Sequence, residues 1–107
     1  MANDRQDSPQ DRLRTRIDRN LAELSEAQTE TGLGLAGGLT TVRDWLAEPG
    51  ISLPVLRNRL HMETLAAVTA HKASAAAGNE DITAYARADA LLSVREWLSE
   101  FETSQEA

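Results

Sequence analysis

One phrase of ten residues occurs twice in this chain, and it constrains the fold more than any other feature. The segment over residues 39–48, LTTVRDWLAE, returns over residues 91–100 as LLSVREWLSE, 52 residues later. Six of the ten positions are identical, and the only two Trp residues, Trp45 and Trp97, occupy the same position. Because its apolar residues recur at helical spacing, the phrase predicts two equivalent helices, the second and fourth of the chain, in a duplicated or quasi-symmetric helical unit.

Length and composition indicate one small domain without disulfides. The chain has 107 residues, of which 41% are hydrophobic and only 4% aromatic, and it has no Cys. This length suits one domain with a modest core, and the lack of Cys excludes a thiol nucleophile and a thiolate metal site. No apolar run approaches the roughly 18 residues of a membrane span, and the polar N-terminus lacks a signal peptide's apolar stretch. We therefore expect a protein of the cytoplasm or of a phage particle.

Helix start and stop signals predict an all-α, four-helix bundle-like domain. Ser8, Ser52 and Asn79 are the predicted N-caps, while Pro49-Gly50 and Gly78 end two of the helices. The third helix has apolar residues around much of its first half, so we expect it to be the most buried. No stretch alternates with a period of two, so no sheet is expected. The predicted parts are a disordered arm over 1–7, one domain over 8–102 with helices at about 9–30, 39–48, 53–77 and 80–101, and an acidic tail over 103–107.

The first predicted helix has a narrow apolar stripe. Leu13, Ile17, Leu21 and Leu24 follow one another at spacings of four, four and three on an otherwise polar helix. Such a stripe is typical of a coiled-coil contact, and a helix of this kind needs a partner to be stable. The stripe can be covered either by the rest of the bundle or by a partner chain; we favour a partner chain, which makes these four residues interface candidates and predicts an oligomer. Trp is enriched among binding hot spots, so Trp45 and Trp97 are further interface candidates besides their simpler role in core packing.

A cluster of four glycines lies in the seven residues 32–38, GLGLAGG. Each glycine destabilises a helix interior by about 1 kcal/mol, so we expect a break or tight turn before the second helix. The pattern also fits the G-x-G-x-x-G of a dinucleotide-binding loop, but that motif requires a preceding strand. Because a polar helix precedes it here, the segment is interpreted as an elbow between helices or as a close-packing backbone patch.

Basic residues gather in two places where they could contact an anion. Arg12, Arg16 and Arg19 fall on one face of the first predicted helix, and a second cluster lies early in the third. The second cluster consists of Arg57, Arg59 and His61. His61 and His71 are ten residues apart, and neither has a His or carboxylate at the third or fourth following position, so no metal site is expected.

The net charge of −6 argues against direct binding of nucleic acid, which requires a positive surface. Ten of the eleven basic residues are Arg, a bias typical of GC-rich bacterial or phage genomes. No cofactor motif and no acid–base pair stand out. The leading hypothesis is a small non-enzymatic interaction or assembly protein that binds itself or another protein. The alternatives are an acidic inhibitor, of the anti-defence type, that blocks a nucleic-acid-binding target, and a binder of a small anion between protomers.

Overall fold

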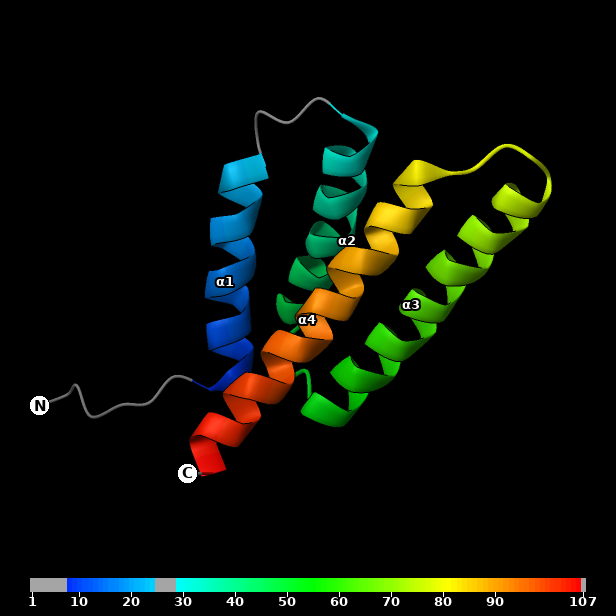
Figure 1. The fold of residues 1–107 in the computed structure, drawn as a ribbon. Helices are drawn as coiled ribbons and strands as arrows, with labels where there is room; N and C mark the ends of the chain where they lie inside the picture. Colours follow the sequence, from blue (N-terminus) through cyan, green and yellow to red (C-terminus); the bar gives the residue numbers. More distant parts are fainter. Residues whose placement is uncertain (1–7, 25–28, 107) are drawn as a thin grey trace, which may run out of the picture.

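The computed structural model describes residues 8–24 and 29–106, with side chains as far as residue 103. These residues form four helices and no strand, so the all-α prediction is confirmed. The helices are α1 (Pro9–Leu24), α2 (Glu30–Leu46), α3 (Leu53–Ala76) and α4 (Ile82–Glu106). Consecutive helices run in opposite directions, so that α2 and α4 are parallel (Figure 1). The predicted disordered arm over 1–7 lies outside the described residues.

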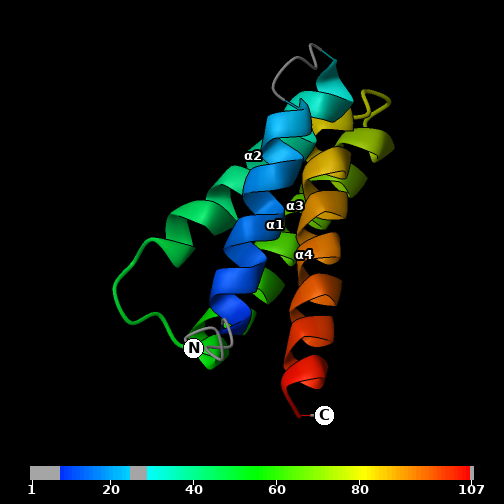
Figure 2. The same ribbon diagram turned by 90° about the vertical axis from the view of Figure 1, so that its left-hand side faces the viewer.

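α4 is the central helix, and each of the other three helices packs on it. Its most extensive contact is with α2, and α1 contacts both of these helices. α3 lies on the far side of α4 from α1 and packs chiefly on α4 (Figures 1 and 2). In consequence, α3 covers one side of α4 while most of its own circumference faces solvent.

The hydrophobic core lies among α1, α2 and α4 and extends to the first half of α3. Both copies of the repeated phrase contribute to it, because the Leu, Val and Leu of each copy are buried. The core residues are Leu13, Ile17, Leu39, Val42, Leu46, Leu56, Leu60, Ala90, Leu91, Val94 and Leu98. Arg14 ties α1 to the end of α2, since its guanidinium donates to the carbonyl oxygen of Leu46 at 2.7 Å.

The glycine-rich segment 32–38 lies within α2, so the predicted break and the predicted helix start at residue 39 are wrong. A Cβ added to Gly34 would lie 2.4 Å from the carbonyl oxygen of Thr83, and one added to Gly38 would lie 3.0 Å from the Cβ of Ala90. The missing side chains therefore let the backbones of α2 and α4 meet. This packing offsets the helix-propensity cost of about 1 kcal/mol per glycine, and it makes the segment a packed contact rather than a phosphate-binding loop.

Several predicted helix ends are confirmed. The Ser8 hydroxyl accepts from the amide of Asp11 at 3.1 Å, and the Ser52 hydroxyl accepts from the amide of Val55 at 3.4 Å. At the end of α3, Gly78 has a φ of +81°, which favours glycine. The amide of Asn79 there donates to the carbonyl oxygen of Ser74, which closes a Schellman motif.

Other helix ends differ from the predictions. Glu30 belongs to α2, whose N-cap is Thr29, rather than to the first helix. α4 begins at Ile82 because the carboxylate of Asp81, rather than Asn79, caps it by accepting from the amide of Ala84 at 3.0 Å. α4 also continues to residue 106, so most of the predicted tail over 103–107 is helical.

The first half of α3 is less buried than its composition suggested. Leu56 and Leu60 are fully buried against α4, but Met62 and Leu65 are 57% and 53% exposed. The reason is that α3 packs chiefly on one neighbour, which covers only one of its apolar faces. Within the described residues, no helix combines the length and apolarity that crossing a membrane requires.

Candidate functional site

The apolar stripe of α1 faces the core of its own chain. Leu13 and Ile17 are fully buried there, and Leu21 and Leu24 are half-buried and pack against the same core. The first two residues therefore have no surface with which to contact a partner while α1 stays in place. This corrects their assignment to an interface: α2 and α4 provide the apolar surface that the stripe needs.

The two Trp residues lie at the edge of the core, each half-buried beneath a guanidinium. Arg59 of α3 lies 5.9 Å from the ring of Trp45, and Arg16 of α1 lies 4.4 Å from the ring of Trp97. Both separations fall within the range of roughly 6 Å for cation–π contacts. Trp45 and Trp97 thus pack at the edge of the core and cover it. Their role as interface anchors stays a prediction.

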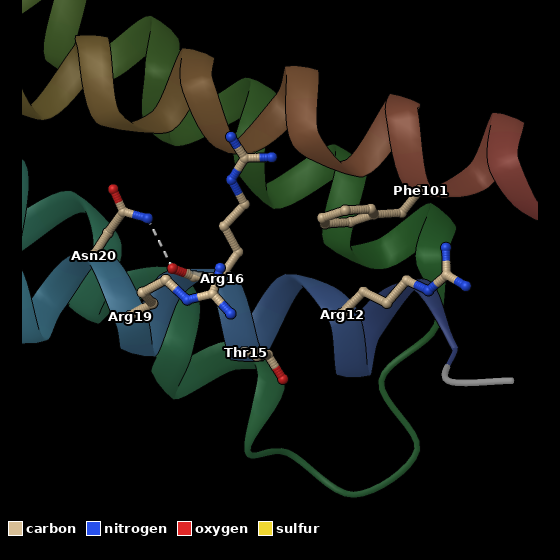
Figure 3. A pocket seen from close by; sticks show the side chains of 6 residues that line it. All are labelled: Arg12, Thr15, Arg16, Arg19, Asn20 and Phe101. Atoms are coloured by element: carbon tan, nitrogen blue, oxygen red, sulfur yellow. Dashed lines mark hydrogen bonds between the residues drawn. The ribbon is translucent and has the colours of Figure 1, made fainter. Parts of the chain in front are cut away.

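An open groove between α1 and the C-terminal half of α4 brings together one predicted arginine cluster. Its volume is about 450 Å³, which is within the range of small-molecule sites. Figure 3 shows that the ring of Phe101 extends from α4 and lies between the side chains of Arg12 and Arg16. The residues that line it are Arg12, Thr15, Arg16, Arg19, Asn20 and Phe101. We call this the arginine groove.

The arginine groove has more positive charge than its surroundings neutralise. Arg16 has one carboxylate partner, Glu100, at 4.0 Å. Among the described residues, no carboxylate lies within 4.0 Å of the Arg12 or Arg19 guanidinium. The neighbouring Asp18 is turned to α2, where it pairs with Arg43 at 3.0 Å. Guanidinium groups are therefore the main binding groups that the groove offers.

The second predicted cluster does not form a site. Arg57 forms an ion pair with Glu102 of α4, whereas Arg59 pairs with Glu48 beyond the end of α2. The hydrogen bond from Arg59 lowers the pKa of Glu48 and raises the pKa of Arg59. His61 is exposed on α3. These arginines are thus engaged singly with carboxylates instead of converging on one anion site.

His71 makes local contacts between α3 and the start of α4. Its Nε2 lies 2.8 Å from a carboxylate oxygen of Glu80, and its ring lies 5.0 Å from the Tyr85 ring at an angle of 60°. Within residues 8–24 and 29–106, no three His, Cys, Asp or Glu side chains are grouped so that they could hold a metal ion.

Sequence reasoning missed an apolar surface on the outer side of α3 and α4. A groove of about 170 Å³ runs between the two helices there, lined in part by Val68, Tyr85 and Leu92. Tyr85 and Leu92 are 57% and 43% exposed. Leu65 continues the surface along α3, because it lies three residues before Val68 and is 53% exposed. We call Leu65, Val68, Tyr85 and Leu92 the outer face. The signal was present in the apolar residues around α3, but it required knowing that α3 has one main neighbour.

Comparisons with known proteins found no match: no family model fits the chain, and no curated protein or solved structure is detectably similar to it. The geometry of the arginine groove and of the outer face therefore carries the functional argument.

Proposed function

We propose that this chain is a non-enzymatic assembly protein that binds a second copy of itself through the outer face. The observation that carries the proposal is the exposed apolar side chains, which are contributed by two adjacent helices and flank one groove. Large contiguous apolar patches on small soluble proteins commonly mark interaction surfaces. A bacterial or phage origin and an intracellular or particle location remain part of the proposal.

Charge favours a second copy as the occupant of the outer face. The chain has a net charge of −6, so most of its surfaces would repel another copy. The groove of the outer face, however, is lined by one cation, Lys72, and one anion, Asp89. A twofold arrangement of two copies would bring the same patch onto itself, with Lys72 of each copy able to face Asp89 of the other. The outer face is thus charge-balanced and able to complement itself.

The test compares the native mass of the wild-type protein with that of a double variant, Leu65→Asp with Leu92→Asp. We expect a dimer for the wild-type protein and a monomer for the double variant, because four carboxylates would be brought into the interface of a dimer. Both side chains are largely exposed, so the variant should keep its helical circular dichroism. The matched control is Leu33→Asp on α2, which is 60% exposed and outside the outer face.

A wild-type monomer at micromolar concentration would contradict the proposal, as would a double variant that stays dimeric. A monomeric wild-type protein would favour the inhibitor hypothesis, in which acidic helices bind a basic partner. Salt separates these two functions, because an acidic contact weakens with ionic strength and an apolar contact does not.

As part of the same proposal, we infer that the chain arose from a duplicated helical hairpin. Two contacts between α2 and α4 support this inference, Gly34 against Ala86 and Gly38 against Ala90. Each pair is separated by 52 residues, the same interval as the repeated phrase. In addition, each Trp is covered by an arginine from the first helix of the other hairpin. Equivalent positions thus meet across the parallel pair of helices.

A further inference from the structure

We propose that the arginine groove binds a phosphate monoester whose organic part is flat and apolar. This site is on α1 and the end of α4, whereas the proposed dimer contact uses the outer face of α3 and α4. The proposal therefore does not depend on the oligomeric state.

The charge of the groove calls for a dianion. The three arginines lie at spacings of four and three on α1, so their side chains leave the same face of the helix. Only Arg16 has a carboxylate nearby, at 4.0 Å, among the residues that the structure describes. Among the described residues, no carboxylate pairs with the guanidinium groups of Arg12 and Arg19, and a phosphate monoester at neutral pH has close to two negative charges.

The donors of the groove suit phosphate oxygens. A guanidinium presents its N–H groups as a planar fork, which fits the oxygens of phosphate or carboxylate in pairs. The other two polar side chains are already used locally: the Thr15 hydroxyl donates to the carbonyl oxygen of Asp11, and the Asn20 amide donates to that of Arg16. A phosphate monoester has close to two negative charges, as many as the two groove arginines that lack a carboxylate partner among the described residues, whereas a carboxylate has one. We therefore favour phosphate over carboxylate.

The apolar part of the ligand is indicated by Phe101. Its ring is half-buried and lies between the side chains of Arg12 and Arg16 (Figure 3). The groove, at about 450 Å³, has room for a ring beside the phosphate. A flat group there would contact the face or edge of Phe101, in the geometry that aromatic pairs prefer. The combination of an aromatic wall with arginines distinguishes this groove from a surface that merely attracts anions.

The experiment is a titration of the 15N-labelled full chain with phenyl phosphate, followed by amide chemical shifts at constant ionic strength. Two control ligands are titrated in parallel. Inorganic phosphate has the phosphate charge but no aromatic ring, and benzoate has the ring but only one negative charge. We expect phenyl phosphate to bind more tightly than either, with shifts confined to residues of α1 and the end of α4. A millimolar dissociation constant is expected for a probe of this size.

Three variants identify the groups that bind. Arg12→Gln with Arg19→Gln should weaken phenyl phosphate about tenfold or more, because each removes hydrogen bonds to a charged group. Arg95→Gln is the control for lost charge, since Arg95 lies on the exposed side of α4 outside the groove. Phe101→Leu should reduce the preference for phenyl phosphate over inorganic phosphate.

Two results would overturn the inference: phenyl phosphate binding no better than inorganic phosphate, or Arg95→Gln weakening it as much as the double variant does. The monomeric variant Leu65→Asp with Leu92→Asp should bind phenyl phosphate as the wild-type protein does, so the two proposals can fail separately. A phosphotyrosine peptide that binds more tightly than phenyl phosphate, through the same arginines, would assign the natural phosphate to a protein side chain. Equal affinities would assign it to a free small molecule.

Discussion

α4 packs on α2 and on α3 in two different ways. Toward α2 it presents small residues to glycines, so the two backbones meet near Gly34 and Gly38 before the larger core side chains take over. Toward α3 it buries Leu56 and Leu60 at one end, but near His71 and Tyr85 the contact opens into the apolar groove of the outer face. The contact of α4 with α2 is therefore tightly packed along its length. The contact of α4 with α3 is tightly packed only at the end near Leu56 and Leu60.

This difference teaches that small residues bring two helices close together only where the facing helix also presents small residues or backbone. The second half of α3 is rich in alanine, a small residue that by itself would permit close helix packing. Ala70, Ala73 and Ala75 are nevertheless exposed, and only Ala67 in this half is buried. Glycine in α2 removes the Cβ itself and admits the backbone of α4, whereas alanine in α3 faces solvent because no third helix covers it.

The largest expected effect on stability distinguishes two adjacent leucines of α4, one in the core with α2 and the other on the outer face with α3. Leu91 is fully buried in the core, and Leu92 is 43% exposed on the outer face. Leu91→Ala should lower the free energy of unfolding by about 2–5 kcal/mol because it leaves a cavity. Leu92→Ala should change it by about 0.5 kcal/mol or less. Urea unfolding followed by circular dichroism, at concentrations where the monomer dominates, measures both; similar losses would mean that the two contacts are equally tight.

An intermediate effect is expected at the glycines of α2. A Cβ at Gly34 would clash with backbone atoms of α4, so Gly34→Ala should lower the free energy of unfolding by about 1–3 kcal/mol. At Gly37 the nearest atom would be 3.7 Å away, at the end of the Arg87 side chain. Gly37→Ala should therefore raise the free energy of unfolding by up to about 1 kcal/mol, through helix propensity alone. Thermal melts of the two variants should move in opposite directions, and a shared direction would refute the close contact of α2 with α4.

The smallest effect concerns the exposed ion pair that links α3 to the end of α2. The hydrogen bond from Arg59 holds the pKa of Glu48 below its ordinary value of 4.5. A lowered carboxyl pKa stabilises the fold above the unfolded-state pKa, and this contribution is lost as the pH falls through the folded-state pKa. Arg59→Gln should raise the pKa of Glu48 toward 4.5 and remove the small loss of stability in acid. Carboxyl 13C shifts measured against pH check this, and Arg95→Gln should leave the titration of Glu48 unmoved.

Much of the fold followed from local signals in the sequence. The caps Ser8 and Ser52 and the apolar stripes of the first, second and fourth helices needed no knowledge of neighbours. The glycine segment was misread because helix propensity counts the local cost of a glycine and not the helix that packs on it. The cap of α4 was misread because Asn79 and Asp81 are both good capping residues, and the Schellman motif at the end of α3 uses the amide of Asn79.

The candidate site divides in the same way. Spacing alone placed Arg12, Arg16 and Arg19 on one face of a helix, and the structure keeps them in one groove. Spacing could not show that Arg57 and Arg59 pair with carboxylates outside α3, nor that Phe101 reaches α1. These contacts depend on how the helices pack against one another, and helix packing cannot be derived from residue spacing within one helix.

The parallel contact of α2 with α4 also has a consequence for the order in which the chain acquires structure. The residues that meet there are 52 positions apart, so α2 has no partner for its glycines until the first part of α4, as far as Ala90, has been synthesised. A helix with so many glycines is unstable in isolation. During synthesis, α2 therefore gains its closest packing partner only when residues 83–90 have left the ribosome.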